Sequence, residues 1–184
     1  MCFSFEVSLG TGLMSWAIVF YLLFTRKLTI IQKNKLIFLL IFSSMQYIDA
    51  ILWYIKMEKN KINYFVTSIL IPIILSAQII FNIYFRNKLN NFYVNLIVVF
   101  MIVYMFRKFN GYSRPICSNK LSSPLWGNKE IRLYELLIFS FMVFYPGLCG
   151  VFIIPLIVLF VGGSYGSLWC AISNISALYY LFKF

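Results

Sequence analysis

Long apolar runs separated by short charged stretches are the dominant pattern of this sequence. The runs cover roughly residues 7–24, 36–55, 64–85, 91–106, 133–149, 150–163 and 166–182. Most approach the roughly 20 residues that an α-helix needs to cross the hydrocarbon core of a bilayer. They lack the period-2 alternation of barrel strands, so helices are predicted. The predicted fold is all-α: a polytopic transmembrane helix bundle that forms one domain over residues 1–184.

The number of spans depends on how the region after residue 132 divides. The runs 133–149 and 150–163 are short and meet at the sequence "YPGLCG", which is rich in turn residues. Seven spans are therefore favoured, and one bent helix across 133–161, giving six spans, is the alternative. Pro72 in the third run predicts a kink there, because proline removes a helical hydrogen bond.

Composition leads to the same protein class. The chain of 184 residues is 62% hydrophobic and 11% charged, which leaves too little polar surface for a water-soluble globule. Its formal net charge is +11, but the Lys and Arg residues lie at the ends of the apolar runs, where they meet lipid headgroups. The predicted partner is the lipid bilayer, and no binding to nucleic acid is expected.

Charge around the first run predicts the orientation. No Lys or Arg precedes this run, whereas "TRKLTIIQKNK" after it carries four. The positive-inside rule then places the N-terminus of this multi-pass integral membrane protein outside the cytosol. Counted over all loops, this orientation leaves seven basic residues inside and nine outside. The two indications conflict, and we give precedence to the first span because it usually dominates.

One polar stretch is long enough to meet a partner. Residues 107–132, "RKFNGYSRPICSNKLSSPLWGNKEIR", hold six of the sixteen Lys and Arg residues. We interpret this stretch as a loop through which the protein could contact another protein. The sequence does not indicate an oligomeric state.

Polar residues inside the apolar runs suggest a site. Gln46, Asp49 and Trp53 follow the spacing of one helical stripe. Because an ionised aspartate costs roughly 2.5–3.5 kcal/mol at the centre of a span, the stripe should face protein or water. Alternation of the spans brings Glu6, Asp49, Glu135 and the turn before the last span to one end of the bundle, which predicts a polar vestibule. The predicted substrate- or ion-binding residues are Glu6, Gln46, Asp49, Trp53, Ser167, Trp169 and Asn174.

Each of these polar residues also has a structural interpretation. For Asp49, a neutral acid bonded to its neighbours has the same weight as a functional group. Glu6 is expected to bind interfacial water or to cap the first helix, and Glu135 is expected to pair with Arg132 at the surface. Deeper amides favour hydrogen bonds between helices over a solute path; these are Gln78, Asn82, Asn95 and Asn174.

Cysteine and histidine usage argues against metal chemistry. The chain has four cysteines without CxxC spacing and no histidine, so we predict no metal site, no cofactor and no enzyme. Cys2 and Cys117 fall on the same predicted face, where a disulfide and two free thiols are both open interpretations. Cys149 and Cys170 are expected to be small packing residues.

Three motifs carry a resemblance to a known family. The opening "MCFSFEVS", the second-span "QYIDAILW" and the late "SYGSLWC" together resemble an uncharacterised family of small multi-pass membrane proteins found in bacteria, algae, fungi and large DNA viruses. In that family the second-span acid is usually a glutamate followed by glycine, where this chain has Asp49 and Ala50. The resemblance implies about seven spans and no reaction. It also implies a shared site at Cys2, Ser4, Glu6, Gln46, Asp49, Trp53, Ser167, Trp169 and Cys170.

These observations favour two functions. The first is a small-solute or cation carrier, channel or receptor-like bundle with an acidic vestibule near one membrane face. The alternative is a structural or assembly membrane protein, for instance a viral one, that transports nothing. An intramembrane hydrolase is disfavoured, because histidine metal sites and the Gly-x-Gly-Asp pattern of aspartyl proteases are missing from the sequence.

Overall fold

The computed structural model describes residues 4–118, 121–147 and 165–184 and is mostly helical, which confirms the predicted all-α class in outline. The predicted run 150–163 lies outside the described residues. The elements are α1 (Phe5–Thr25), α2 (Ile30–Tyr54), α3 (Lys61–Phe65), η1 (Val66–Leu70), α4 (Ile71–Ile80), η2 (Phe81–Arg86), α5 (Phe92–Lys108), β1 (Arg114–Ser118), β2 (Leu121–Leu125), α6 (Leu133–Phe144) and α8 (Tyr165–Lys183).

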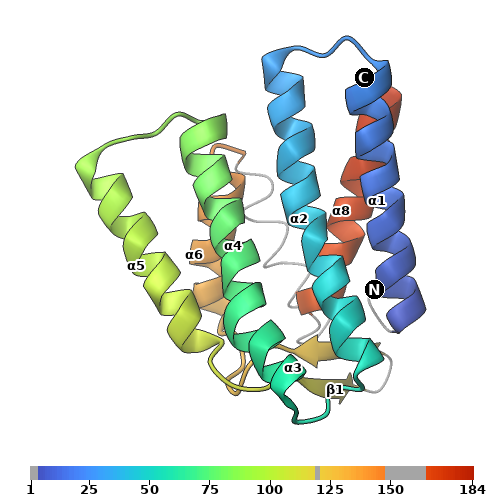
Figure 1. The fold of residues 1–184 in the computed structure, drawn as a ribbon. Helices are drawn as coiled ribbons and strands as arrows, with labels where there is room; N and C mark the ends of the chain where they lie inside the picture. Colours follow the sequence, from blue (N-terminus) through green and yellow to red (C-terminus); the bar gives the residue numbers. More distant parts are fainter. Residues whose placement is uncertain (1–3, 119–120, 148–164) are drawn as a thin grey trace.

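The helices run up and down, so their ends gather at two ends of the molecule (Figure 1). We call one the hairpin end: there α1, α3, α6 and α8 begin, α2 and α5 end, and the strands β1 and β2 lie. The other is the basic end, which contains the α1–α2 and η2–α5 connections and the last turn of α8. Its charged residues are Arg26, Lys27, Lys33, Lys35, Arg86, Lys88 and Lys183.

Helix α2 is the centre of the packing. Thr29 and Gln32 form a capping box that fixes its start, and the helix packs against α1, α8 and α4. Small residues let α1 approach closely, since Ser8, Gly12 and Ser15 lie on its buried stripe. A Cβ added at Gly12 would lie 3.2 Å from the Tyr47 ring.

The third long helix is continuous from Lys61 to Arg86 but changes its winding. It begins as α3 behind the Asn60 cap, widens to π-helix in η1, returns to α-helix in α4 and widens again in η2. Pro72 lies directly after η1, at the start of α4. The structure shows a π-helical turn directly before this proline, and the predicted kink itself stays a prediction.

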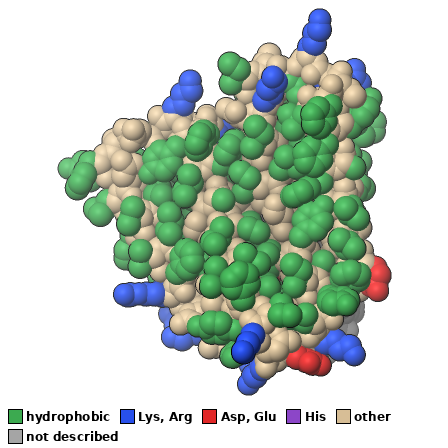
Figure 2. Space-filling model, in the orientation of Figure 1, with side chains coloured by type: hydrophobic (Ala, Val, Ile, Leu, Met, Phe, Trp, Pro, Cys, Tyr) green, Lys and Arg blue, Asp and Glu red, His purple; other side chains and the backbone are tan. Residues whose placement is uncertain are grey.

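The surface is that of a membrane protein. In the described part of the chain three helices are long and apolar enough to cross a membrane: Phe5–Thr25, Ile30–Tyr54 and Lys61–Arg86. Helix α5 exposes large apolar side chains, among them Phe92, Leu96 and Phe100. Hydrophobic side chains cover the middle of the face in Figure 2, with charged ones toward the ends. Large apolar side chains exposed together in this way mark surfaces that meet a membrane or another protein.

The prediction that residues 107–132 form only a loop is wrong. Strands β1 and β2 pair antiparallel within it, with Arg114 opposite Leu125 and Ser118 opposite Leu121. This hairpin lies across the end of the bundle, next to α2 and α8 (Figure 1). We call residues 107–132 the cover segment, because they fold over this end of the bundle and contribute side chains to its interior.

Candidate functional site

Asp49 lies inside the protein, near the hairpin end of α2. Its side chain has no exposed surface, and Trp126 Nε1 donates a hydrogen bond of 3.0 Å to Asp49 Oδ1. A buried carboxyl group needs such donors, because leaving one unbonded in a medium of low polarity costs free energy. The second helix and the cover segment are thus joined through a polar contact in the interior.

The residues around Trp126 fix the position of its indole ring. Trp126 follows β2, is 5% exposed and packs edge-on against Phe109, with ring centroids 6.3 Å apart. Gly127 has φ +79°, and a Cβ there would lie 3.2 Å from Phe109 Cα. Only glycine fits this left-handed conformation and close approach without strain.

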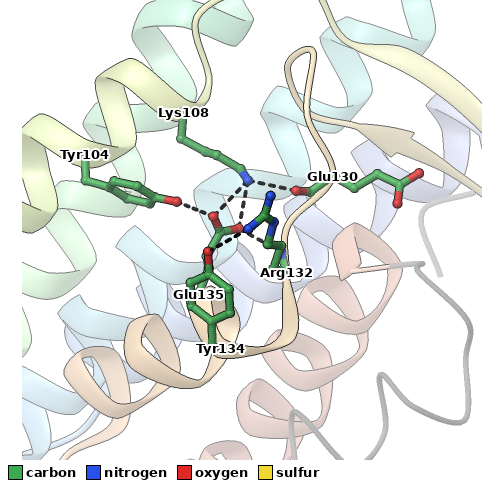
Figure 3. A network of polar contacts seen from close by, with 6 residues as sticks. All are labelled: Tyr104, Lys108, Glu130, Arg132, Tyr134 and Glu135. Carbon is green, nitrogen blue, oxygen red and sulfur yellow. Dashed lines mark hydrogen bonds and ion pairs between the residues drawn. The ribbon is translucent and has the colours of Figure 1, made fainter.

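A second polar group joins α5 to α6. Lys108 Nζ lies 2.8 Å from Glu135 Oε2 and 3.0 Å from Oε1, and each side chain is only 9% exposed. The hydroxyl of Tyr104 donates to Glu135 Oε1, and the backbone N–H of Arg132 donates to Oε2 at 2.7 Å. Figure 3 shows the Glu135 carboxylate enclosed by these groups. Lys108 also donates to the backbone oxygen of Glu130 at 2.7 Å.

The expected surface pair of Glu135 with the Arg132 side chain is therefore wrong. Glu135 receives only the backbone N–H of Arg132, while its ionic partner is Lys108. The Arg132 guanidinium instead donates to the Tyr134 hydroxyl at 3.3 Å. This hydrogen bond raises the pKa of Arg132, so Arg132 stays a cation on the outside of the network.

An apolar pocket lies between the Asp49–Trp126 contact and the Lys108–Glu135 ion pair. It has a volume of about 50 Å³ and lies between α4, α5, α6 and the cover segment. Methionine, leucine and aromatic side chains form most of its wall, and the polar atoms of Tyr104, Lys108 and Glu135 complete it. The lining residues are Leu75, Met101, Tyr104, Met105, Lys108, Phe109, Trp126, Ile131, Glu135, Leu136 and Phe139.

A buried clamp fixes the start of the cover segment. Asn63 has no exposed surface, donates to the backbone oxygens of Met57 and Ser113 at 3.0 Å each, and accepts from Ser113 N–H at 2.9 Å. Thr67 bonds both Asn63 Oδ1 and the Ser113 hydroxyl. Ser68 accepts from Gly111 N–H at 3.0 Å. The clamp anchors residues 111–113 to the third helix.

Replacing Asn63 with alanine should lower the free energy of unfolding by about 2–3 kcal/mol, because it leaves several buried backbone groups without partners. Thermal unfolding of the purified protein in detergent measures this loss. Asn110→Ala is the matched control, since its exposed side chain accepts only a hydrogen bond from Tyr64, and it should change stability by less than about 0.5 kcal/mol. Equal effects of the two substitutions would contradict the clamp.

Five of the seven residues predicted to form the site can be placed, Asp49 among them. Glu6 is exposed at the start of α1, whereas Gln46 is buried and donates to the Ser173 hydroxyl of α8. Trp53 is half-buried against the main apolar core. Asn174 accepts a hydrogen bond of 2.8 Å from Ser15 of α1. Because Asp49 has no exposed surface, it does not line an open vestibule together with Glu6 in this conformation.

The remaining predicted residues fall partly or wholly outside the described part of the chain. Ser167 and Trp169 lie in the first turns of α8, and Cys117 lies in β1, but their side chains are not among those described. Cys2 lies outside the described residues, so the disulfide between Cys2 and Cys117 stays a prediction. Within the described residues, no cluster of three or more acidic or cysteine side chains forms a metal site.

The deeper amides differ from one another. Asn82 donates to the backbone oxygens of Met142 and Tyr145 at 2.9 and 3.0 Å, as expected for a bond between helices. Gln78 is fully buried, and in the described structure neither of its amide atoms has a hydrogen-bond partner. Its amide is therefore free to bond a buried water or a polar ligand in the bundle.

Sequence reasoning missed Trp126, Tyr104 and Lys108. Trp126 is the one tryptophan of the polar stretch and precedes "GN", a turn pattern that marks a fixed local conformation. Lys108 and Glu135 are 27 residues apart, and no local spacing connects them. Comparison of the chain with family models, curated proteins and solved structures finds no match, so the function is argued from geometry.

Proposed function

We propose that this chain is a multi-pass integral membrane protein that binds a small amphipathic organic cation at its hairpin end, as a carrier or a receptor-like bundle. Seven spans and an N-terminus outside the cytosol are part of the proposal. The resemblance to the uncharacterised multi-pass family is also part of the proposal; this chain matches the second-span motif at Gln46 and has Asp49 where the family usually has a glutamate. Three helices long and apolar enough to cross a membrane support the membrane assignment.

One observation carries the choice of ligand: the apolar pocket has a carboxylate, that of Glu135, in its wall. An apolar body would occupy the space between Met101, Met105 and Leu136. The ammonium group of the ligand would replace the ammonium of Lys108 on Glu135. Rings of Tyr104 and Trp126 line the same pocket and favour a cation over an anion.

The pocket must widen for such a ligand. Its volume of about 50 Å³ is below the roughly 300–1,000 Å³ of drug-sized sites. Met101 and Met105 form part of its wall, and methionine side chains rearrange easily because they are unbranched and flexible. Departure of Lys108 from Glu135 would add the volume of its side chain.

Alkylammonium rescue tests the proposal. In Lys108→Ala, butylammonium supplies an ammonium on an alkyl chain one carbon longer than the part of the side chain removed. It should bind roughly tenfold more tightly than in the wild type, because Lys108 no longer competes for Glu135. Thermal unfolding of the purified full chain across a butylammonium titration reports this binding. Phenethylammonium should stabilise the wild type, and its uptake into liposomes would separate a carrier from a receptor-like protein.

Two controls make the result specific. Glu135→Gln keeps the shape of the side chain and removes its charge, so the alkylammonium effect should vanish there. Butanol, the neutral counterpart of the probe, should have no effect on any variant. The proposal fails if Glu135→Gln responds as the wild type does, or if butanol stabilises as well as butylammonium.

The assembly role is supported by a different observation. Several polar side chains connect helices to each other, as Gln46 does with Ser173 and Ser15 does with Asn174. A folded protein that binds neither ammonium probe would favour this role, with residues 107–132 as the surface for a protein partner. Crosslinking in native membranes, with and without substitutions at exposed Arg114 and Lys129, would then identify that partner.

A further inference from the structure

A second pocket lies at the basic end of the bundle, whereas Glu135 lies at the hairpin end. It has a volume of about 150 Å³ and lies between the start of α2, the end of η2 and the last turns of α8. Two cations, Lys35 and Arg86, line it together with the hydroxyl side chains of Ser176 and Tyr180. The other lining residues in the described part of the chain are apolar and include Phe38 and Phe42. Such a wall fits a ligand with a charged head and an apolar body.

Arg86 is held in place within this pocket. Its Nη1 donates to Asn82 Oδ1 at 3.3 Å, and its guanidinium lies 5.4 Å from the centroid of the Phe38 ring. Asn82 is itself fixed by its hydrogen bonds to the backbone of α6 and the residue after it. A guanidinium positioned in this way offers its other N–H groups to an anion at little cost in side-chain entropy.

No acidic residue neutralises these cations. The sequence has five Asp and Glu residues, all of them within the described part of the chain. By the bounds of the helices each lies toward the hairpin end; they are Glu6, Asp49, Glu58, Glu130 and Glu135. The basic end carries seven Lys and Arg side chains and no Asp or Glu, a formal side-chain charge of +7. Among the described residues the only ion pair is that of Lys108 with Glu135. Lys35 and Arg86 thus face the pocket with their charges uncompensated.

The level of the pocket relative to the membrane indicates which part of a lipid it can contact. Lys35 directly precedes the apolar run 36–55, and Arg86 directly follows the run 64–85. Both cations therefore lie where an apolar span meets the headgroup layer, the level of lipid phosphates. We infer that this pocket binds a phosphate group on an apolar body, the headgroup of an anionic phospholipid. Lys35 and Arg86 contact the phosphate, and Phe38 and Phe42 contact the glycerol and first acyl carbons.

Binding of phosphatidylglycerol to the full chain in phosphatidylcholine nanodiscs tests this inference. We expect one site per chain. Lys35→Gln and Arg86→Gln should each weaken binding about fivefold, the effect of one basic residue near an anionic headgroup. Arg86→Lys should recover only part of the affinity, because it keeps the charge but loses the positioned guanidinium. Unfolding midpoints in pure phosphatidylcholine check that each variant folds.

Lys33→Gln and Lys88→Gln are the matched controls. Both residues are exposed at the same end, outside the pocket lining, and their loss should weaken binding less than about twofold. Equal losses in controls and pocket variants would overturn the inference, since diffuse attraction would then explain the binding. Equal binding of phosphatidylglycerol and phosphatidylcholine would overturn it as well.

A second set of titrations distinguishes a soluble phosphate ligand from a lipid. Glycerol 3-phosphate and inorganic phosphate are titrated onto the protein in neutral detergent. We expect them to bind at least tenfold more weakly than the lipid, since they lack the apolar body. Tight binding of glycerol 3-phosphate that depends on Lys35 and Arg86 would overturn the lipid assignment and make a free phosphate ester the ligand. Absence of binding in both arms would eliminate the site altogether.

Discussion

Replacing Glu135 with alanine should lower the free energy of unfolding by about 3–5 kcal/mol, because it leaves the Lys108 ammonium nearly buried without its counter-ion. The two side chains are 9% exposed each and 2.8 Å apart. The same substitution also removes the acceptor of the Tyr104 hydroxyl and of the Arg132 N–H. Equilibrium unfolding in mixed micelles measures the loss.

Two further variants separate the ion pair from packing. Glu130→Ala is the matched control: its side chain is exposed, and Lys108 uses only its backbone oxygen, so stability should change by less than about 0.5 kcal/mol. The double variant Lys108→Met with Glu135→Leu should recover most of the stability, because an apolar pair replaces a desolvated ionic one. A loss below about 1 kcal/mol in Glu135→Ala would show that water screens this pair.

Replacing Trp126 with alanine should cost about 3–5 kcal/mol, the usual penalty for removing a large buried aromatic side chain. The indole packs on Phe109 and donates to Asp49, so the substitution opens a cavity and removes a hydrogen bond from a carboxyl group with no exposed surface. Unfolding of the purified protein, followed by loss of helical circular dichroism, measures the effect.

Conservative substitutions at this contact separate the stability contributed by ring packing from that contributed by the hydrogen bond. Trp126→Phe keeps most of the packing and removes only the donor, so it should cost about 1–3 kcal/mol. Asp49→Asn keeps an oxygen acceptor for the indole N–H and should cost less than about 1 kcal/mol. Should Trp126→Phe be as stable as the wild type, the hydrogen bond to Asp49 contributes nothing, and the inward position of Asp49 needs another cause.

The positions of the helices could be predicted because each apolar run has to satisfy its own backbone in lipid. The inward position of Asp49 could also be predicted, since a charge is costly in hydrocarbon. Gln46, three residues earlier on the same stripe, is buried as well. These features follow from local periodicity and from the transfer cost of polar groups.

The partners of the acids could not be predicted. Asp49 and Trp126 are 77 residues apart, and they meet only because the cover segment folds back over the bundle. Its hairpin carries no strong strand pattern, since Pro115 lies opposite Pro124 and proline is unfavourable in central strands. A two-stranded sheet consists of edge strands only, so both prolines are tolerated.

The two π-helical stretches of the third helix have a consequence for reading related sequences. Val66, Thr67 and Ser68 are three consecutive buried residues, which a regular α-helical wheel would spread over more than half its circumference. The wider turn lets Thr67 and Ser68 both reach the 111–113 backbone while Val66 stays in the core. A homologue with one residue fewer before its counterpart of Pro72 would be expected to have a plain α-helix there, and gap placement in an alignment should allow for this.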